Sequence, residues 1–159
     1  NGLLRSHGQY RNGLRHGFYR YYEDGTLSVD EQWSSDVMES RKIRIMTPEA
    51  QMISVFDIAY LMPKGNKKVL IYTNDGQSID TFEPAENLYY RLGNDLFFLA
   101  NKKSRVMVNR NCVRGIISQP DGTFLDLDPS PDFKIYPDED CVKAVESLLR
   151  DGLDELMED

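Results

Sequence analysis

Cysteine is scarce in this chain, since the 159 residues include only Cys112 and Cys141. Two cysteines are too few for a disulfide framework, and they lack the spacing of metal-ligand pairs. The default interpretation is two buried thiols in a reducing compartment, and a single bridge between them is the open alternative. The scarcity therefore excludes a small domain held together by several disulfides.

Long apolar runs are also missing. No segment approaches the ~20 consecutive apolar residues of a transmembrane helix, so we expect no membrane span. The hydrophobic content of 40% is enough for a packed core in one domain with a small appendage. The sequence begins at Asn1 rather than Met, so the absence of a signal peptide says little about the compartment. We expect a cytoplasmic protein, with an exported one as the alternative.

Catalytic motifs are absent as well. The sequence contains no P-loop, no glycine-rich dinucleotide motif, no HExxH pair and no nucleophile elbow. Its two histidines, His7 and His16, each precede a glycine at matching repeat positions and are interpreted as structural. No pair of acids is singled out by apolar surroundings as a tuned acid–base couple. We therefore expect a protein that is not an enzyme and that holds no cofactor or metal.

Positive charge is in overall deficit but is unevenly distributed. The net charge is −7, from 19 Lys and Arg against 26 Asp and Glu. Residues 1–40 hold 4 cations and 6 acids, residues 41–128 hold 12 and 10, and residues 129–159 hold 3 and 10. The acidity thus lies mainly in the C-terminal region, while the centre is mildly basic. This asymmetry says more about partners than the total charge does.

Residues 1–33 contain a short repeat. An Asn-Gly or Asp-Gly pair recurs at residues 1–2, 12–13 and 24–25, with aromatic, strand-prone segments between the pairs. These dipeptides favour two-residue hairpin turns because both central positions tolerate positive φ, so successive antiparallel hairpins are predicted. The pattern HGQYRNGLRHGFYRYYEDGTL resembles the MORN family, particularly its bacterial variant. Residues 34–41 show no periodicity and are predicted to be a linker.

The rest of the chain, residues 42–159, alternates short strand-like segments with turns and then ends in a helix. Pro84 precedes a predicted helix over residues 85–92, which Gly93 ends. Asp138 is a good N-cap for a second helix extending to residue 157. Strand-like segments are predicted at 42–47, within 52–60, and at 69–73, 78–82, 96–100, 105–108, 113–118, 124–127 and 133–136. The predicted fold class is α+β, mostly antiparallel β.

The C-terminal helix is amphipathic, and its acidic face lies opposite an apolar stripe. The stripe consists of Val142, Val145, Leu148, Leu149, Leu153 and Leu156. We expect the helix to pack on the sheet, and a partner-binding arm is the alternative. Periodicity along the whole chain predicts a core that includes Phe56, Ile58, Leu70, Leu88, Leu92, Phe97, Val108, Ile116 and Leu149.

Four motifs occur in a fixed order over residues 42–118. Residues 57–61 read DIAYL, the segment KKVLIYTNDGQSIDTF forms a predicted hairpin, and FFLANK is followed by Val108-Asn109 with Val113 and Ile116. This order resembles the LytTR domain, in which the corresponding motifs are IxYIE, FFR[VA][HN]R and VNxxxI. The resemblance implies a small, mostly antiparallel β domain over residues 42–159 that binds duplex DNA through loops in the major groove.

The resemblance implicates three zones in DNA contact. The first is the turn around Lys64 and Asn66, the second is the hairpin at residues 101–105, and the third is the loop at residues 136–140. Between Asn101 and Arg114 the chain has five cations and no acid, as phosphate contact requires. Lysines suit phosphates, whereas Asn and Arg make bidentate contacts to bases. The predicted DNA-binding residues are Lys67, Lys68, Asn101, Lys102, Lys103 and Arg105.

The sequence supports two functions. The first is a DNA-binding transcriptional regulator, in which the three acids at residues 138–140 would repel phosphate. The second is a non-catalytic protein-interaction module that uses the acidic helix or an aromatic ribbon, and either module is compatible with a homodimer. The ribbon consists of Tyr10, Phe18, Tyr19, Tyr21, Tyr22 and Trp33. A coherent positive surface around Lys67, Lys102 and Arg105 would favour DNA, and cations neutralised by neighbouring acids would favour the interaction module.

Overall fold

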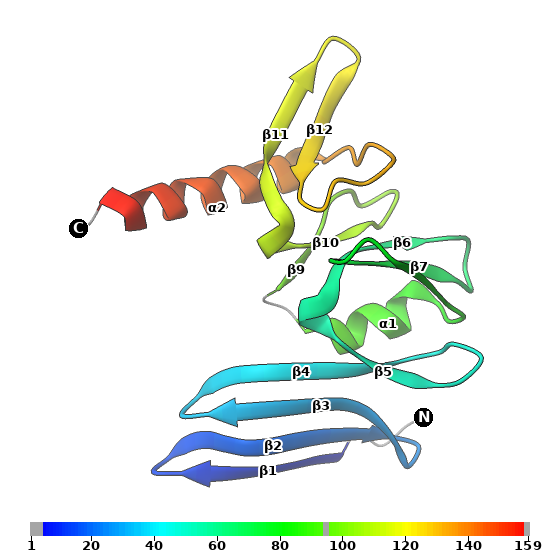
Figure 1. The fold of residues 1–159 in the computed structure, drawn as a ribbon, viewed down its shortest axis with the longest axis vertical. Helices are drawn as coiled ribbons and strands as arrows, with labels where there is room; N and C mark the ends of the chain where they lie inside the picture. The colour runs from blue at the N-terminus through cyan, green and yellow to red at the C-terminus, as the bar shows by residue number, and fades with distance from the viewer. Residues whose placement is uncertain (1–4, 94–95, 158–159) are drawn as a thin grey trace.

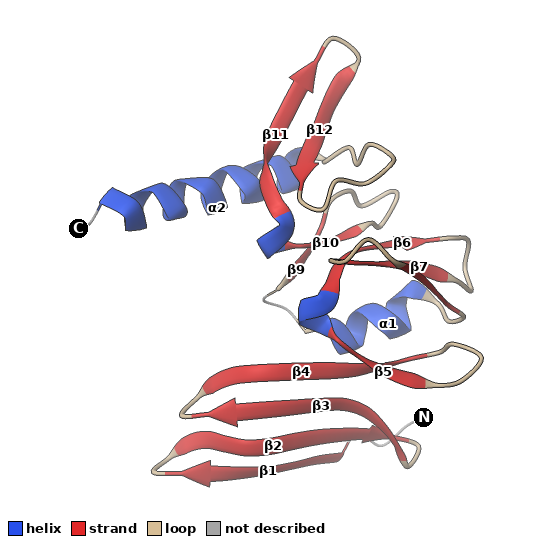
Figure 2. Ribbon diagram, viewed as in Figure 1, coloured by secondary structure: helices blue, strands red, loops and turns tan. Residues whose placement is uncertain are grey.

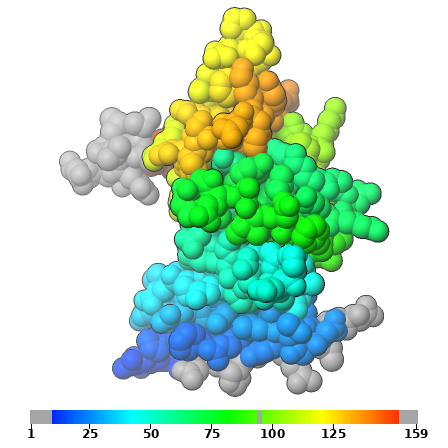
Figure 3. All heavy atoms as spheres, turned by 45° about the vertical axis from the view of Figure 1, so that its right-hand side comes forward, coloured from blue at the N-terminus to red at the C-terminus, as the bar shows by residue number. Residues whose placement is uncertain are grey.

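The computed structural model describes residues 5–93 and 96–157, with side-chain environments for residues 10–93 and 96–151. Three layers are stacked along the long axis of the molecule (Figures 1 and 3). The first layer is a five-stranded antiparallel sheet, sheet A, in which the strands follow one another in sequence order. Its strands are β1 (Arg5–Arg11), β2 (Leu14–Glu23), β3 (Thr26–Ser34), β4 (Val37–Ile45) and β5 (Gln51–Ser54).

The hairpins predicted for the first third of the chain are confirmed. Asn12 and Gly13 both have positive φ (54° and 78°), as do Asp24 and Gly25 (49° and 77°), so each pair forms the expected two-residue turn. These turns set the order of the first three strands and their antiparallel pairing.

The predicted linker over residues 34–41 is instead part of sheet A. Ser35 and Asp36 adopt positive φ (49° and 66°) and turn the chain from β3 into β4. Asp36 fixes this turn against β2, because its Oδ1 accepts a hydrogen bond from Arg15 N at 2.7 Å and its own N donates to Arg15 O at 3.0 Å. The turn was missed because it lacks glycine, and an aspartate tolerates left-handed backbone well enough to replace it. Sheet A therefore crosses the predicted domain boundary.

The second layer holds sheet B and helix α1. Sheet B is antiparallel, with strand order β8-β7-β6-β10-β9. In Figure 2, α1 (Ala85–Leu92) lies between sheet A and sheet B. The strand predicted at 69–73 and the helix predicted at 85–92 have the observed bounds. The strands of sheet B are β6 (Ile58–Pro63), β7 (Val69–Thr73), β8 (Ser78–Thr81), β9 (Phe97–Leu99) and β10 (Met107–Asn109), and short 3₁₀ turns η1 (Val55–Asp57) and η2 (Arg110–Cys112) precede β6 and follow β10.

The third layer is a hairpin and the C-terminal helix. The hairpin pairs β11 (Val113–Gln119) with β12 (Gly122–Leu127), and α2 spans Glu139–Met157. Asp138 caps α2 as predicted, because its Oδ1 accepts a hydrogen bond from Cys141 N at 2.9 Å. The strand predicted at 133–136 is wrong: the segment has no regular pairing and makes one backbone bond to β12, from Leu125 N to Ile135 O at 2.9 Å.

Two apolar clusters form the core. The first joins sheet A to α1 and sheet B, with Ile43, Ile45, Ile58, Leu61, Val69, Ile71, Leu88 and Leu92 almost fully buried. The second joins sheet B to the third layer through Tyr60, Val108, Cys112, Leu125, Leu127, Ile135, Cys141 and Val145. Both thiols are buried and free, as the default interpretation predicted. The fold is α+β and mostly antiparallel β, which confirms the predicted class.

Five predicted core residues are buried, namely Ile58, Leu88, Leu92, Phe97 and Val108. Leu70 and Ile116 are half-buried. The predictions for Phe56 and Leu149 are wrong, since these side chains are 37% and 39% exposed. Phe56 lies in η1, where the alternation of a strand does not apply, and Leu149 is exposed whereas its neighbour Leu148 packs against the second cluster. Leu153 and Leu156 lie outside the described side chains. No helix in the described ranges is long and apolar enough to cross a membrane.

Candidate nucleic-acid interface

The first two predicted zones meet on one surface. Zone one is the turn between β6 and β7, which Lys64 N closes by donating to Lys68 O at 2.8 Å. Zone two is the loop between β9 and β10, closed by hydrogen bonds from Ala100 N to Val106 O at 2.8 Å and from Arg105 N to Asn101 O at 2.7 Å. Together with the start of α1, the two zones line a cleft of about 340 Å3. Its lining residues are Pro63, Gly65, Asn66, Ala85, Glu86, Lys103, Ser104 and Arg105.

Asn101 organises zone two. Its Oδ1 accepts a hydrogen bond from Lys103 N at 2.8 Å, and its Nδ2 donates to Tyr136 O at 3.2 Å. The second bond ties zone two to zone three, the segment before α2. Both ends of the amide are therefore engaged inside the protein, so Asn101 positions the loop in this structure.

Zone three contributes two carboxylates to the same surface. Asp138 Oδ2 accepts a hydrogen bond from Lys102 N at 3.1 Å, and Asp140 Oδ2 lies 2.7 Å from Lys102 Nζ. The hydrogen bond from Lys102 lowers the pKa of Asp140 and correspondingly raises the pKa of Lys102. The predicted third zone is thus adjacent to the second, and its acids neutralise one of the predicted cations.

Arg105 is held by α1. Its backbone is left-handed (φ 59°), and its carbonyl oxygen accepts a hydrogen bond from Tyr89 Oη at 2.6 Å. Its guanidinium forms an ion pair with Glu86. The hydrogen bond that the guanidinium donates within this pair lowers the pKa of the Glu86 carboxyl. Burial raises the pKa of Tyr89, which keeps the phenol protonated and able to donate. The side chain predicted to reach bases is therefore folded against α1.

The remaining cations divide into paired and unpaired residues. Lys68 Nζ lies 3.2 Å from Asp80 Oδ2 and 5.8 Å from the centre of the Phe82 ring. Lys64, Lys67 and Lys103 are exposed and have no acid within ion-pair distance in the part of the chain that the structure describes.

The three zones and the acids that contact them form a surface that we call the loop face, with six cations and five acids. The cations are Lys64, Lys67, Lys68, Lys102, Lys103 and Arg105, and the acids are Asp80, Glu86, Asp138, Glu139 and Asp140. The three ion pairs on it are exposed to solvent, and pairs of this kind contribute little to stability. A phosphate can therefore replace a carboxylate at little cost.

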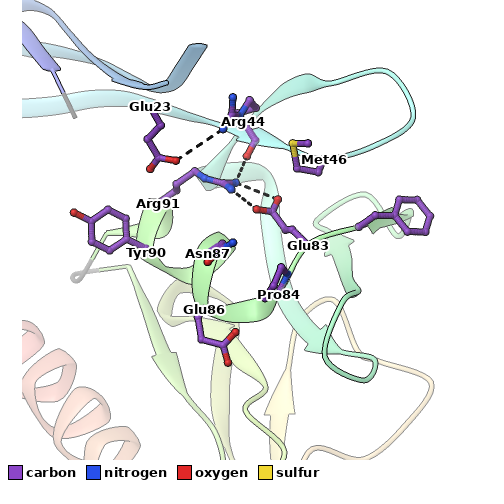
Figure 4. Close-up of a pocket in the computed structure, with 10 residues that line it drawn as sticks. Glu23, Arg44, Met46, Glu83, Pro84, Glu86, Asn87, Tyr90 and Arg91 are labelled. Carbon is purple, nitrogen blue, oxygen red and sulfur yellow. Dashed lines mark hydrogen bonds and ion pairs between the residues drawn. The ribbon is translucent and has the colours of Figure 1, made fainter. Parts of the chain in front are cut away.

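A second cleft, of about 460 Å3, lies between sheet A and α1 (Figure 4). Arg91 is 4% exposed on its floor, and its guanidinium forms an ion pair with Glu83, with Nη1 3.1 Å from Glu83 Oε2. The same guanidinium donates to Arg44 O in β4. The charge of Arg91 is thus paired within the protein through its two Nη atoms, while its buried Nε has no hydrogen-bond partner among the described residues, and the group anchors α1 to sheet A.

The Arg91 anchor continues into sheet A. Arg41 donates to Arg91 O from Nε at 3.1 Å and from Nη2 at 2.6 Å, and it also forms an ion pair with Glu31. Sequence reasoning missed this network. The available signal was helical spacing, because Arg91 follows Leu88 by three positions and precedes Leu92, which places an arginine on the apolar face of α1.

No group of three or more His, Cys, Asp or Glu side chains in the described ranges is arranged to hold a metal ion. No family model matches the chain, and no curated protein matches it. Among solved structures, the chain is similar to one from Bacillus cereus described as the LytTr DNA-binding domain of a methyl-accepting/DNA response regulator. The identity is 17% and the TM-score 0.47, with 70% of this chain and 95% of that chain covered. A likeness of this extent does not assign the chain to a family.

Proposed function

We propose that the chain is a non-catalytic, cytoplasmic DNA-binding module of a transcriptional regulator that contacts duplex DNA through the loop face. The observation that carries the proposal is the convergence of three loops that are far apart in the sequence, at residues 63–68, 101–105 and 136–140. The LytTR-like motifs of the sequence implicate these same loops. Each loop reaches one surface, and six cations lie there.

The charges of the loop face support contact with phosphates. Lys64, Lys67 and Lys103 are exposed and unpaired in the described structure, so they can bind phosphates without breaking an ion pair. Neutralising three phosphates gives a slope of about −2.7 for log binding constant against log salt concentration. If Lys68, Lys102 and Arg105 also exchange their carboxylates for phosphates, the slope approaches about −5.

The direct test is a mobility shift of random duplex DNA across a salt series. We expect wild-type protein to bind at low salt, and Lys67→Ala and Lys103→Ala each to reduce the slope by about one unit. Lys42→Ala is the matched control, because Lys42 is an exposed lysine on the opposite face of sheet A from the buried Ile43. The absence of a shift with any duplex at low salt, or an equal effect of the control, would contradict the proposal.

The acids provide a test in the opposite direction. Asp140→Asn and Glu86→Gln remove carboxylates that now hold Lys102 and Arg105. Both variants should bind duplex DNA more tightly than wild type, because the released cation becomes available to phosphate and a repelling charge is lost. Glu146→Gln, an exposed acid on α2 away from the loop face, is the control.

A protein-interaction module is the second candidate, and the pairing of three loop-face cations with acids favours it. In that case Asp140→Asn and Glu86→Gln have no effect on DNA, which wild-type protein does not bind. The aromatic surface of sheet A then becomes the leading contact site. The shift assay with these two variants therefore separates the two functions.

A further inference from the structure

Sheet A extends beyond the region that α1 covers. In Figure 1 the end of the sheet that carries the turns at residues 12–13 and 35–36 projects past the helix. On the face that continues from the buried Val29 and Ile43, this end carries a group of aromatic and arginine side chains that we call the aromatic platform. It consists of Tyr10, Arg15, Tyr19 and Trp33.

The platform is internally ordered. The rings of Tyr10 and Tyr19 meet edge to face with centroids 6.3 Å apart, and those of Tyr19 and Trp33 are also 6.3 Å apart. The guanidinium of Arg15 lies 4.8 Å from the centre of the Trp33 ring. Trp33 Nε1 donates to Glu31 Oε1 at 3.1 Å, which fixes the indole. The surface is therefore formed before any partner arrives, which reduces the ordering cost of binding.

The composition and exposure of the platform are those of a protein contact site. Tyr10 is 69% exposed and Trp33 is half-buried, although Tyr19 between them is only 6% exposed. Trp, Tyr and Arg are the residue types that dominate binding energy at interfaces. Arg15 gives the platform a positive charge, because no acid lies within ion-pair distance of its guanidinium in the described structure, whereas Arg20 is paired with Asp30 at 3.4 Å and Glu31 beside Trp33 is paired with Arg41. The partner should therefore be apolar and acidic.

The outer half of α2 is both apolar and acidic, as the partner of the platform should be. Cys141 and Val145 pack on the body and are 2% and 0% exposed, whereas Leu149 is 39% exposed. The helix continues to Met157 and in Figure 1 leaves the body on the same side as the platform end of sheet A. Residues 146–159 contain six acids and one cation. This segment is the acidic, amphipathic complement of the platform within the same chain.

We propose that two copies of the chain pair, with the outer half of each α2 resting on the aromatic platform of the other copy. The contact is isologous, so it closes as a symmetric dimer with two equal interfaces. Two such contacts are needed to approach the roughly 1,200–2,000 Å2 that stable interfaces bury. In Figure 1 the turns at residues 64–67 and 101–105 lie on the opposite side of the molecule, so pairing leaves the loop face open.

Matched pairs of exposed side chains give the test, with dimerisation of the full chain followed by sedimentation equilibrium. Tyr10→Ala is compared with Tyr90→Ala, since these tyrosines are 69% and 70% exposed, and Leu149→Ala is compared with Leu99→Ala, since both leucines are 39% exposed. Tyr10→Ala and Leu149→Ala should each raise the dimer dissociation constant about tenfold or more, and the controls less than about twofold. Added salt should also weaken the dimer.

Charge reversal tests whether α2 of the other copy is what binds the aromatic platform. Arg15→Glu and Asp151→Arg should each abolish the dimer when studied alone, because every contact then opposes like charges. Mixing the two variants should restore a heterodimer, because the unchanged helix of the Arg15→Glu chain can rest on the unchanged platform of the other. Restoration also shows that both variants are folded.

Three results would overturn the proposal. The first is a wild-type chain that stays monomeric across about a hundredfold range of concentration, where mass action would populate the dimer. The second is a dimer that Tyr10→Ala weakens and Leu149→Ala does not, which would mean that the sheets pair without the helix. The third is a monomer whose binding to single-stranded oligonucleotides is lost in Tyr10→Ala, which would assign base stacking to the platform.

Discussion

Arg91 shows how a single buried charge can fix the arrangement of two layers. Its guanidinium contacts Glu83 and donates to Arg44 O, and its carbonyl oxygen accepts two hydrogen bonds from Arg41. Removing one member of a buried ion pair leaves the other charge buried and unpaired. The energetic penalty of that unpaired charge is larger than the net contribution of the pair. The stability of the α1–sheet A contact therefore depends on keeping both partners.

Replacing Arg91 should accordingly destabilise the fold more than replacing the pair. Arg91→Ala is expected to cost about 3–5 kcal/mol, because Glu83 stays buried without its cation. The double variant Arg91→Met/Glu83→Gln should lose clearly less, since no unpaired charge remains. Urea denaturation of the three proteins measures the difference, and additive losses from the two single changes would show that the pair is not coupled.

Cys141 makes a pH-dependent contribution. Burial raises the pKa of its thiol from 9.0 to about 11. The unfolded chain therefore loses this proton at lower pH than the folded chain, so the contribution is full below about pH 9 and is lost as pH rises to about 11. A shift of this size corresponds to at most about 2.7 kcal/mol. Urea midpoints measured from pH 7 to 11 should fall less steeply for Cys141→Ala than for wild type, and parallel curves would refute the assignment.

At the scale of elements, the sequence predicted the bounds of those strands and helices that depend on neighbouring residues alone. The strand at 69–73 and the helix at 85–92 have the observed bounds because alternation, Pro84 and Gly93 are all local. The turn at residues 35–36 was missed because its left-handed backbone is stabilised by Arg15, a residue of another strand. The segment at 133–136 forms no strand, because its pairing with β12 is limited to one bond, which no sequence pattern reveals.

DNA contact by the candidate site stays a prediction, and only the placement of its zones can be compared with the structure. The sequence resemblance indicated three zones, and the structure brings them together. The partners of the cations were not predictable, because Asp80, Glu86 and Asp140 lie 12, 19 and 38 positions away from Lys68, Arg105 and Lys102. An acid-free run of sequence is therefore no guide to local charge once the chain has folded.

Helix α2 illustrates a corrected expectation that can be measured. The apolar stripe suggested that Leu149 anchors the helix, whereas Val145 is fully buried and Leu149 is 39% exposed. Val145→Ala should cost about 2 kcal/mol, from the lost methyl groups and the cavity they leave. Leu149→Ala should cost less than about 1 kcal/mol in dilute protein. The reverse order of the two losses in urea denaturation would mean that the helix packs through its outer half.

At the scale of the whole molecule, the apolar clusters determine how many folding units there are. The first cluster contains Val29 and Ile43 from sheet A together with Leu88 from α1 and Ile71 from sheet B. The Arg41–Arg91 contact adds polar bonds across the same boundary. The hairpin repeat thus shares its core with the rest of the chain, and the layers should unfold together.

The chain contains natural probes for this prediction. Trp33 is the only tryptophan and lies in sheet A, whereas Cys112 and Cys141 are the only cysteines and belong to the second cluster, at the other end of the molecule. Tryptophan fluorescence and thiol accessibility, followed on the same urea series, should give coincident transitions, as cooperative unfolding requires. Cys112→Ala would confirm that the thiol signal reports the second cluster, by leaving Cys141 as its only source. A fluorescence transition at clearly lower urea than the thiol transition would show that sheet A unfolds on its own and that the predicted division near residues 34–41 is a true domain boundary.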